Sequence, residues 1–179
     1  MRKTESQKIA LCGVLGALSV VLMLVGAALQ VGTYAAPMFA AFLAIPVLEE
    51  YGPRYALLLY GTVSVLALLL VPETELALFY VLVVGYYPVL RRTLRKVKPT
   101  ALRWLIKFLV FNAATALVYG LLFALFGPAV LQELTADGTG VLVLLLALGN
   151  LSFFLCDRAI GAVSRYYRVI LRKKLKHFF

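Results

Sequence analysis

The chain has 179 residues, of which 63% are hydrophobic and only 15% are charged, and its mean hydropathy is +0.95. Because a soluble domain is nearer half apolar and about a quarter charged, this composition excludes an ordinary soluble protein. Six membrane spans of roughly 20 residues would use most of the length, which excludes an appended soluble domain as well. The net charge of +10 favours a cytoplasmic face held against anionic lipid headgroups, and we expect no nucleic-acid partner.

Six apolar segments follow one another along the chain. Their ranges are 8–29, 34–48, 55–71, 76–90, 104–126 and 141–163. Segments of this length and composition are typical of transmembrane helices. We therefore predict an all-α membrane protein, a bundle of six transmembrane helices that forms a single domain over residues 1–179. The first segment follows basic residues, as a signal peptide would, but its apolar run is too long for a typical signal core, so we expect it to be retained.

The second and fourth segments are short. The second contains Pro37 and Pro46, and the fourth contains Gly85 and Pro88. At about 1.5 Å per residue each helix would rise about 22 Å, less than the roughly 30 Å of a bilayer core. Two interpretations remain open. Either these segments break and line a binding site, as in many transporters, or they are kinked helices in a tight bundle.

Basic residues are unevenly divided among the loops. The loops at residues 30–33, 72–75 and 127–139 contain no Lys or Arg, whereas both termini and the other two loops are basic. Since Lys and Arg accumulate on the cytoplasmic side of membrane proteins, we predict that both termini are cytoplasmic and that these three loops are external. The expected location is multi-pass in a cell membrane, specifically a bacterial plasma membrane.

The C-terminal segment 164–179 has the pattern of an amphipathic helix. Arg165, Arg168 and Arg172 recur at steps of three and four, and Val169 supplies apolar contact. We predict a basic amphipathic cytoplasmic tail that lies on the inner leaflet, where it would contact anionic lipid. Binding of the tail to a specific protein partner is the alternative.

Small residues line one face of the first segment. Ala10, Gly13 and Ala17 are spaced by three and four residues, so they share a helical face. Small residues at this spacing let another helix approach closely. The face either packs within this chain's own bundle or docks on a separate membrane subunit.

Acidic residues stand near the inner ends of two segments. Asp157 is costly to bury and should have a basic partner. The candidates for that partner are Arg91, Arg92 and Arg165. A proton-relay role for Asp157 is the alternative to a structural ion pair. The acidic pair at 49–50 is expected to cap helix ends and to pair with basic residues at the inner face.

The outward halves of the segments carry polar side chains but no Lys or Arg. Tyr80 and Tyr119 lie there, and Asn150 lies near mid-membrane. An aromatic belt and interhelical hydrogen bonds would explain such residues; the alternative is that these three bind a substrate. A strongly anionic substrate would normally require a basic partner or exposed helix N-termini. We therefore expect a neutral or cationic substrate, with an aromatic ring that can stack on tyrosine.

Motifs of known chemistry are absent from the sequence. It contains no Walker loop, nucleotide fingerprint, metal-ligand cluster or nucleophile–base pair. From two cysteines and a single histidine we expect neither a disulfide nor a metal site. The chain is therefore expected not to be an enzyme, to need no cofactor, and to depend on another protein for any energy that it uses.

These features together resemble the substrate-binding S component of energy-coupling factor (ECF) transporters. The resemblance rests on six spans in 179 residues, on both termini inside, and on the small-residue face, and it covers essentially the whole chain. In that family an A-x-x-x-A-like surface docks on a transmembrane coupling subunit, and Gly13-x-x-x-Ala17 occupies the matching place. The resemblance implies a cavity open to the outside for a vitamin-like micronutrient, with partner ATPases that supply the energy. The first external loop, 30–33, is shorter than the lid of many members.

A second class of protein also remains open. Rod-shape morphogenesis proteins of the MreD type are likewise small, multi-span and without catalytic residues, and they are membrane scaffolds of cell-wall assembly. A small molecule that co-purifies with the chain would favour the transporter. A stable complex with a cell-wall machine, without any ligand, would favour the scaffold.

Overall fold

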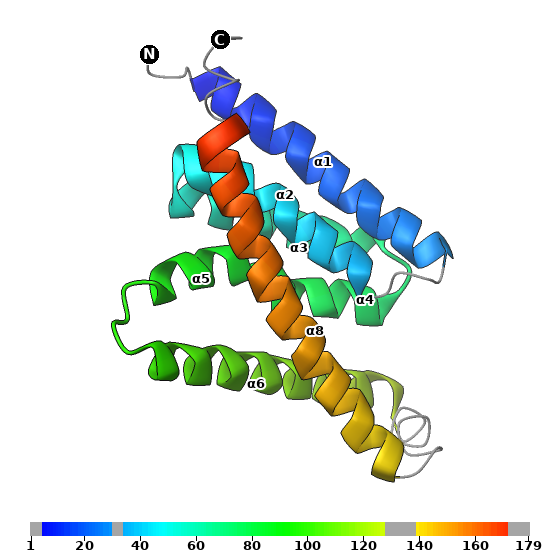
Figure 1. The fold of residues 1–179 in the computed structure, drawn as a ribbon. Helices are drawn as coiled ribbons and strands as arrows, with labels where there is room; N and C mark the ends of the chain where they lie inside the picture. Colours follow the sequence, from blue (N-terminus) through cyan, green and yellow to red (C-terminus); the bar gives the residue numbers. More distant parts are fainter. Residues whose placement is uncertain (1–4, 30–33, 128–138, 172–179) are drawn as a thin grey trace.

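A computed structural model describes residues 5–29, 34–127 and 139–171 of the chain (Figure 1). These residues are almost entirely helical and contain no strand. The helices are α1 (Glu5–Leu29), α2 (Ala35–Tyr51), α3 (Pro53–Leu70), α4 (Thr74–Phe79), the π-helical turn η1 (Tyr80–Val84), α5 (Tyr87–Leu94), α6 (Thr100–Phe126), α8 (Thr139–Tyr166) and the π-helical turn η2 (Tyr167–Leu171). The predicted all-helical class is thereby confirmed.

Five helical stretches within the described residues are long and apolar enough to cross a membrane. They are Glu5–Leu29, Pro53–Leu70, Thr74–Leu94, Thr100–Phe126 and Val143–Val169. Their large apolar side chains are widely exposed, as at Leu58, Leu69 and Leu109, which is the pattern of helices that face lipid. The chain is therefore a multi-pass membrane protein. The sixth apolar helix, α2, has 17 residues, of which eight are buried.

The second segment is a continuous helix rather than a broken one. Pro37 lies in the first turn of α2, where a missing backbone donor costs little, and Pro46 lies inside the helix without ending it. Pro46 therefore exposes no helix N-terminus, whereas Pro37 belongs to the N-terminal turn of α2 itself. Alanines such as Ala40 and Ala44 are almost completely buried along α2, and their small side chains let α1 and α3 pack closely on it.

The fourth segment contains a π-helical irregularity within one helical stretch, Thr74–Leu94. Between α4 and α5 the backbone passes through the η1 turn, where the Gly85 amide donates to the Tyr80 carbonyl at 2.8 Å. The Tyr60 hydroxyl of α3 donates to the Val81 carbonyl at 2.7 Å, which satisfies a polar group of this irregular backbone. Gly85 is required there, because a Cβ atom would lie 2.7 Å from the Tyr60 ring.

The helices form two groups joined by α4 and α5. Figure 1 shows α1, α2 and α3 lying together, α6 on the opposite side of the molecule, and α4 and α5 between them. Helix α8 crosses α6 and continues to pack on α2. It runs without a break into the predicted tail as far as Tyr166, after which η2 follows; residues 172–179 of that tail lie outside the described residues.

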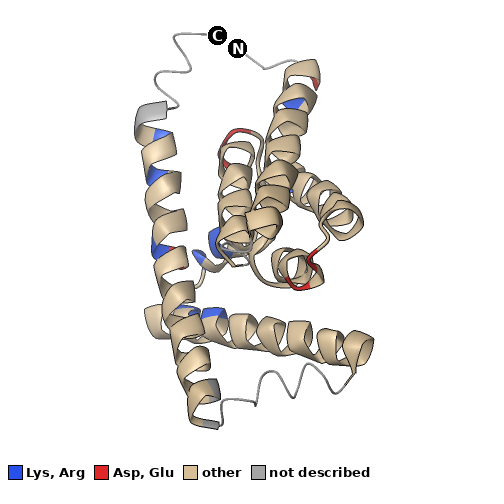
Figure 2. Cartoon of the chain, turned by 90° about the vertical axis from the view of Figure 1, so that its right-hand side faces the viewer, with Lys and Arg blue, Asp and Glu red and all other residues tan. Residues whose placement is uncertain are grey.

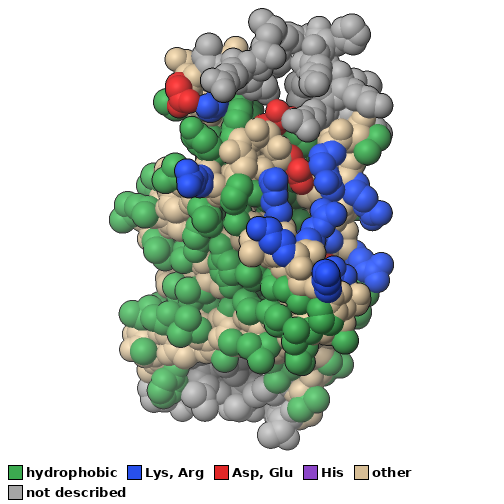
Figure 3. Space-filling model, turned by 90° about the vertical axis from the view of Figure 1, so that its left-hand side faces the viewer, with side chains coloured by type: hydrophobic (Ala, Val, Ile, Leu, Met, Phe, Trp, Pro, Cys, Tyr) green, Lys and Arg blue, Asp and Glu red, His purple; other side chains and the backbone are tan. Residues whose placement is uncertain are grey.

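Basic side chains gather at one end of the bundle. Figure 2 shows Lys and Arg at the start of α6 and along the C-terminal half of α8, and Figure 3 shows the face on which their side chains collect. The first turn of α1 and the last turns of α8 lie at the same end (Figure 1). Of the three loops that lack Lys and Arg, residues 72–75 are described, whereas 30–33 and 128–138 lie outside the described residues.

Candidate functional site: a polar pocket between α2, α4, α6 and α8

A pocket of about 490 Å³ lies where four helices meet. Helix α6 contributes a face on which Asn112, Thr115 and Tyr119 recur at steps of three and four residues. The other lining residues are Tyr34, Met38, Glu75, Phe79, Phe111, Val118, Leu145, Leu146, Leu148, Gly149, Asn150 and Ser152. Pockets for small ligands usually measure roughly 300–1,000 Å³, so this one has the size for a vitamin-like molecule.

One end of the pocket is an acidic group that we name the Glu75 triad, formed by Tyr34, Glu75 and Tyr119. The Tyr34 hydroxyl donates to Glu75 Oε1 at 2.7 Å. The Tyr119 hydroxyl lies 3.2 Å from the same oxygen and 3.0 Å from the Tyr34 hydroxyl. Glu75 is the one charged residue among the described residues that line the pocket. The triad therefore gives this end of the pocket a negative charge without a basic partner.

The other polar group is a reciprocal pair of amides. Asn112 Nδ2 donates to Asn150 Oδ1 at 2.9 Å, and Asn150 Nδ2 donates to Asn112 Oδ1 at 3.2 Å. Each Nδ2 also donates to a carbonyl one turn earlier in its own helix, to Phe108 and Leu146 respectively, at 2.8 Å. The pair holds α6 against α8 at the wall of the pocket, as interhelical amide bonds commonly do in membranes.

Aromatic rings supply the walls between the two polar groups. The Tyr34 ring meets Phe79 edge-on with centroids 5.2 Å apart, and Phe111 stacks on Phe153 at 4.4 Å. Phe153 of α8 therefore packs behind Phe111, which is itself buried. The pocket thus combines an apolar middle with polar groups at separate places, which is the usual composition of a small-molecule site.

Of the three residues predicted to bind substrate, two line this pocket and one does not. Tyr119 and Asn150 are both in the lining. Tyr80 is only 1% exposed and lies at the start of η1, where its ring packs against Tyr60 with centroids 6.2 Å apart. Tyr80 therefore lies outside this pocket, because its ring faces α3. Whether Tyr119 and Asn150 bind a substrate stays a prediction.

Four further pocket residues, Tyr34, Glu75, Phe79 and Asn112, were not among those predicted to bind substrate. Glu75 and Phe79 are four residues apart and share a face of α4, a spacing that excludes the adjacent Tyr80 from that face. Asn112 and Tyr119 are seven residues apart, two turns of α6, which places both side chains on the same side. Periodicity could therefore have found Glu75 and Asn112. The approach of Tyr34 to Glu75 depends on tertiary packing and had no local signal.

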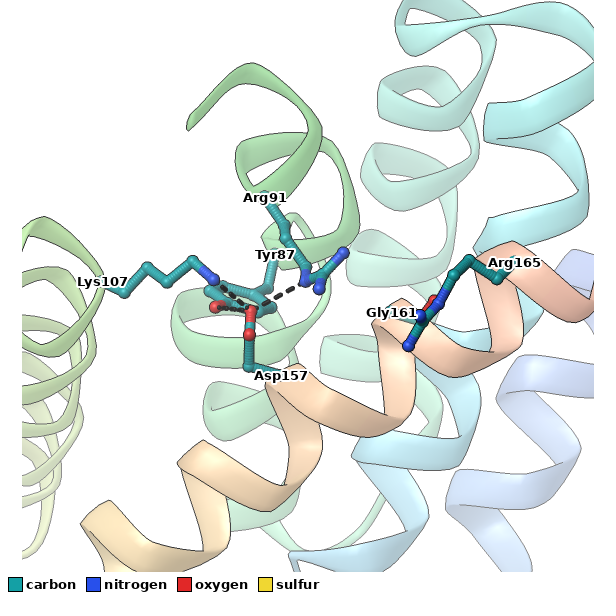
Figure 4. Close-up of polar contacts among 6 residues, drawn as sticks. All are labelled: Tyr87, Arg91, Lys107, Asp157, Gly161 and Arg165. Carbon is teal, nitrogen blue, oxygen red and sulfur yellow. Dashed lines mark hydrogen bonds and ion pairs between the residues drawn. The ribbon is translucent and has the colours of Figure 1, made fainter. Parts of the chain in front are cut away.

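A second polar group surrounds Asp157, away from the pocket (Figure 4). Asp157 Oδ1 accepts from Lys107 Nζ at 2.6 Å, from the Tyr87 hydroxyl at 2.7 Å and from Arg91 Nε at 2.8 Å. The ion pair expected from the sequence is confirmed with Arg91, and Lys107 is a partner that the sequence did not indicate. Three helices, α5, α6 and α8, are thereby joined at one carboxylate.

The other two predicted partners of Asp157 bond elsewhere. Arg92 donates to the Leu48 carbonyl at 2.6 Å, and Arg165 donates to the Gly161 carbonyl at 3.4 Å. The Arg91 guanidinium lies directly against Gly161, where any Cβ atom would collide with it. The acidic pair at 49–50 does meet basic and polar groups of the C-terminal region, since Glu49 pairs with Arg168 at 3.7 Å.

The small-residue face of α1 is not covered by another described helix. Ala10, Gly13 and Ala17 are all exposed, and a Cβ atom at Gly13 would meet nothing within 4 Å. Gly16, on the adjacent face, is buried against Leu59 and Val63 of α3. Gly13 and Ala17 instead line a shallow surface groove of about 450 Å³ between α1 and α3. Packing within this chain's described bundle therefore does not account for the exposed face.

No family model, curated protein or solved structure matches the chain.

Proposed function

We propose that this chain is a membrane-embedded substrate-binding subunit for uptake of a small, vitamin-like micronutrient, of the kind found as the S component of ECF transporters. The observation that carries the proposal is the pocket of about 490 Å³ with Glu75, Tyr119 and Asn150 in its wall. A scaffold protein needs no such combination of apolar walls and polar groups at membrane depth, where unpaired polar side chains are costly.

The distribution of charge supports an external substrate. Glu75 lies at the start of α4, directly after a loop without Lys or Arg, and the described basic residues collect at the opposite ends of the helices. If the basic end is cytoplasmic, as the positive-inside rule requires, the Glu75 triad faces the outside. A nutrient would then enter the pocket from the side on which it is found. Six spans with both termini inside are part of this proposal.

The exposed face of α1 supports a partner subunit. An apolar helix with Ala10, Gly13 and Ala17 uncovered can let a second helix approach closely, which is how small residues promote association in membranes. In the proposed complex this face contacts a transmembrane coupling subunit, and separate ATPases supply the energy. The basic end of the chain would then lie at the cytoplasmic face, where the ATPases and anionic lipid are located.

Mass spectrometry of small molecules released from the purified chain tests the proposal. The expected result is a stoichiometric micronutrient that rebinds to the emptied protein, and whose uptake by cells requires both this chain and an ATP-hydrolysing partner. The alternative scaffold function predicts that no small molecule is released and that the chain is recovered in a stable complex with cell-wall enzymes. That combination would refute the transport proposal.

A further inference from the structure

The two polar groups of the pocket, the Glu75 triad and the Asn112–Asn150 pair, use their side-chain hydrogen-bond donors internally or on backbone carbonyls. In the Glu75 triad the hydroxyls of Tyr34 and Tyr119 have one hydrogen each, and the carboxylate only accepts. Two hydrogens can serve only two of the three short contacts among these residues at one time. In each arrangement both hydrogens are donated within the triad. What the triad presents to a ligand is oxygen lone pairs and a negative charge.

The amide pair has the same character. A side-chain amide has two N–H donors and an oxygen with two lone pairs. Asn112 spends both donors, one on Asn150 and one on the Phe108 carbonyl, and Asn150 spends its two on Asn112 and the Leu146 carbonyl. Each Oδ1 accepts one bond from the partner amide, so one lone pair on each oxygen remains. The pair can only accept from a ligand.

The wall also contains donors that are not used within the chain. The remaining polar side chains among the described lining residues are the hydroxyls of Thr115 and Ser152, and the buried Thr115 hydroxyl has no hydrogen-bond partner. Tyr34 and Glu75 lie at the N-terminal ends of α2 and α4, where the first backbone N–H groups have no partner within the helix. None of these donors carries a full charge, and Glu75 is the one charged residue among the described lining residues. A carboxylate or phosphate ligand would therefore meet a negative charge and no Lys or Arg side chain.

The two acceptor groups are separated by two helical turns. Tyr119 and Asn112 lie seven residues apart on α6, which corresponds to about 10 Å along the helix axis. Phe79 and Phe111 line the apolar space between. A ligand that satisfies both ends must carry donors at both ends and a flat or apolar middle.

Resting on the proposed binding function, we infer that the substrate is an aromatic cation with nitrogen donors at both ends, whose charged amidinium-like or ammonium group binds the Glu75 triad and whose distal N–H group binds the Asn112–Asn150 pair. This ligand class is narrower than the class of neutral or cationic substrates expected from the sequence. It requires hydrogen-bond donors at both ends of the ligand, and not only the absence of a negative charge. Hydrogen bonds to an ionised partner are roughly twice as strong as neutral ones, so the charge at Glu75 dominates selectivity.

Three isosteric probes test this ligand class on the purified full-length chain in lipid nanodiscs. They are para-aminobenzamidine, para-aminobenzamide and para-aminobenzoate, which share a ring and a distal amine and differ in charge. Binding is measured by ligand-observed saturation-transfer NMR. We expect the amidine to bind about tenfold more tightly than the neutral amide, as the difference between charged and neutral hydrogen bonds predicts, and the benzoate not to bind.

The matched variants are Glu75→Gln and Glu73→Gln. Glu75→Gln keeps an acceptor for the two tyrosines but removes the charge. The amidine and the amide should therefore bind this variant with about equal affinity. Glu73 lies two residues earlier and outside the lining, and its substitution should leave the preference unchanged. If Glu75→Gln does not fold, the order of the three probe affinities for the wild-type chain tests the ligand class by itself.

The outcomes separate this inference from the proposed function. Equal binding of the amidine and the amide, or a preference for the benzoate, overturns the ligand class while leaving a binding protein. Release of a di- or tricarboxylate or a phosphate ester from the purified chain does the same. If no probe binds to the folded wild-type chain and no small molecule is released from it, both the ligand class and the binding function are wrong.

Discussion

Lys107 of α6 and Asp157 of α8 form an ion pair of 2.6 Å in which both side chains are nearly inaccessible, at 5% and 3% exposure. Arg91 and Tyr87 of α5 donate to the same carboxylate oxygen, and the Lys107 ammonium also lies 4.5 Å from the centre of the Trp104 ring. Two cations and an aromatic ring therefore surround one anion. This arrangement satisfies each charge only while α5, α6 and α8 keep their present positions.

Substitution of Asp157 by Asn should destabilise the protein more than substitution of Lys107 by Met. Asp157→Asn leaves the buried Lys107 and the partly buried Arg91 without a counter-charge, and removal of one partner from a buried pair costs about 3–5 kcal/mol. Lys107→Met leaves Asp157 with Arg91 and Tyr87, so the loss should be smaller. Thermal unfolding of the detergent-solubilised variants, followed by intrinsic fluorescence, measures both.

The double variant Asp157→Asn/Lys107→Met provides the control. Because the second substitution removes one of the cations left unpaired by the first, we expect it to recover part of the lost stability. Additive losses would mean that the two side chains do not interact, and would contradict the ion pair.

The helices themselves could largely be predicted from the sequence, whereas the path of the fourth segment could not. Apolar runs at 8–29 and 104–126 correspond to α1 and α6, whose ends differ by a few residues from those expected. The hydropathy of the sequence does not predict the π-helical turn at η1. That turn depends on Gly85 admitting the Tyr60 ring, which is a contact between segments distant in the sequence.

The same turn explains why Tyr80 lies outside the pocket. A tyrosine in the outer half of a short, interrupted segment is a reasonable ligand candidate, but the face of α4 that reaches the pocket is set by Glu75 and Phe79. Tyr80 is rotated by about 100° from Phe79 and packs on Tyr60 instead. Tyr119 and Asn150 lie on regular helices, where position along the segment is enough to place a side chain.

Replacement of Gly85 by Ala should destabilise the fold. The new Cβ would lie 2.7 Å from the Tyr60 ring and 2.8 Å from the Tyr80 carbonyl oxygen, so the ring or the turn must move. Overpacking of this kind typically costs about 1–3 kcal/mol. The control is Gly61→Ala on α3, whose Cβ would meet nothing within 4 Å. A melting temperature equally unaffected by both changes would contradict the role of Gly85.

Cysteine labelling should establish the sidedness of the bundle. In a variant without Cys12 and Cys156, a cysteine at Thr74 should react with an impermeant thiol reagent in intact cells, because Thr74 begins α4 within the segment 72–75, which has no Lys or Arg. A cysteine at Thr93, among the basic residues of α5, should react only after the cells are opened. Labelling of Thr93 in intact cells would reverse the proposed orientation.

Substitution of Gly13 by Leu should prevent association with a coupling subunit without unfolding the chain. A side chain at Gly13 enters open space, so the isolated protein should keep its stability and bind its ligand as before. A leucine would hold the partner helix several ångströms away and abolish close packing. Co-purification of the partner and ligand uptake measure the loss. Val14→Leu, at a position already 67% exposed, is the control for added bulk on α1.

The opposite result is expected at Gly16. Its Cβ would lie 3.1 Å from Leu59 of α3, so Gly16→Leu should lower the stability of the isolated chain as well as its function. If Gly13→Leu behaved like Gly16→Leu, with folding and binding lost together, the exposed face would be internal and the docking proposal would fail.

Alanine substitutions at Tyr119 and Asn150 should each weaken binding of the released ligand. Tyr119→Ala removes one hydroxyl from the Glu75 triad and part of the wall, and Asn150→Ala removes one acceptor and frees an Asn112 donor that would repel the ligand's own donor. A loss of about 1.4 kcal/mol or more is expected, which corresponds to at least about a tenfold weaker affinity. Isothermal titration with the emptied protein measures it.

Tyr80→Phe is the matched control for Tyr119, because it keeps the buried ring against Tyr60 and removes a hydroxyl that is not in the pocket. Its affinity should equal that of the wild-type chain. Tyr80→Ala would be a poor control, since truncation of a buried aromatic ring typically costs about 3–5 kcal/mol of stability and would lower binding through the fold. Unchanged affinity after both Tyr119→Ala and Asn150→Ala would show that the ligand binds elsewhere. A loss with Tyr80→Phe alone would mean that the ligand reaches η1, and would move the site toward α3.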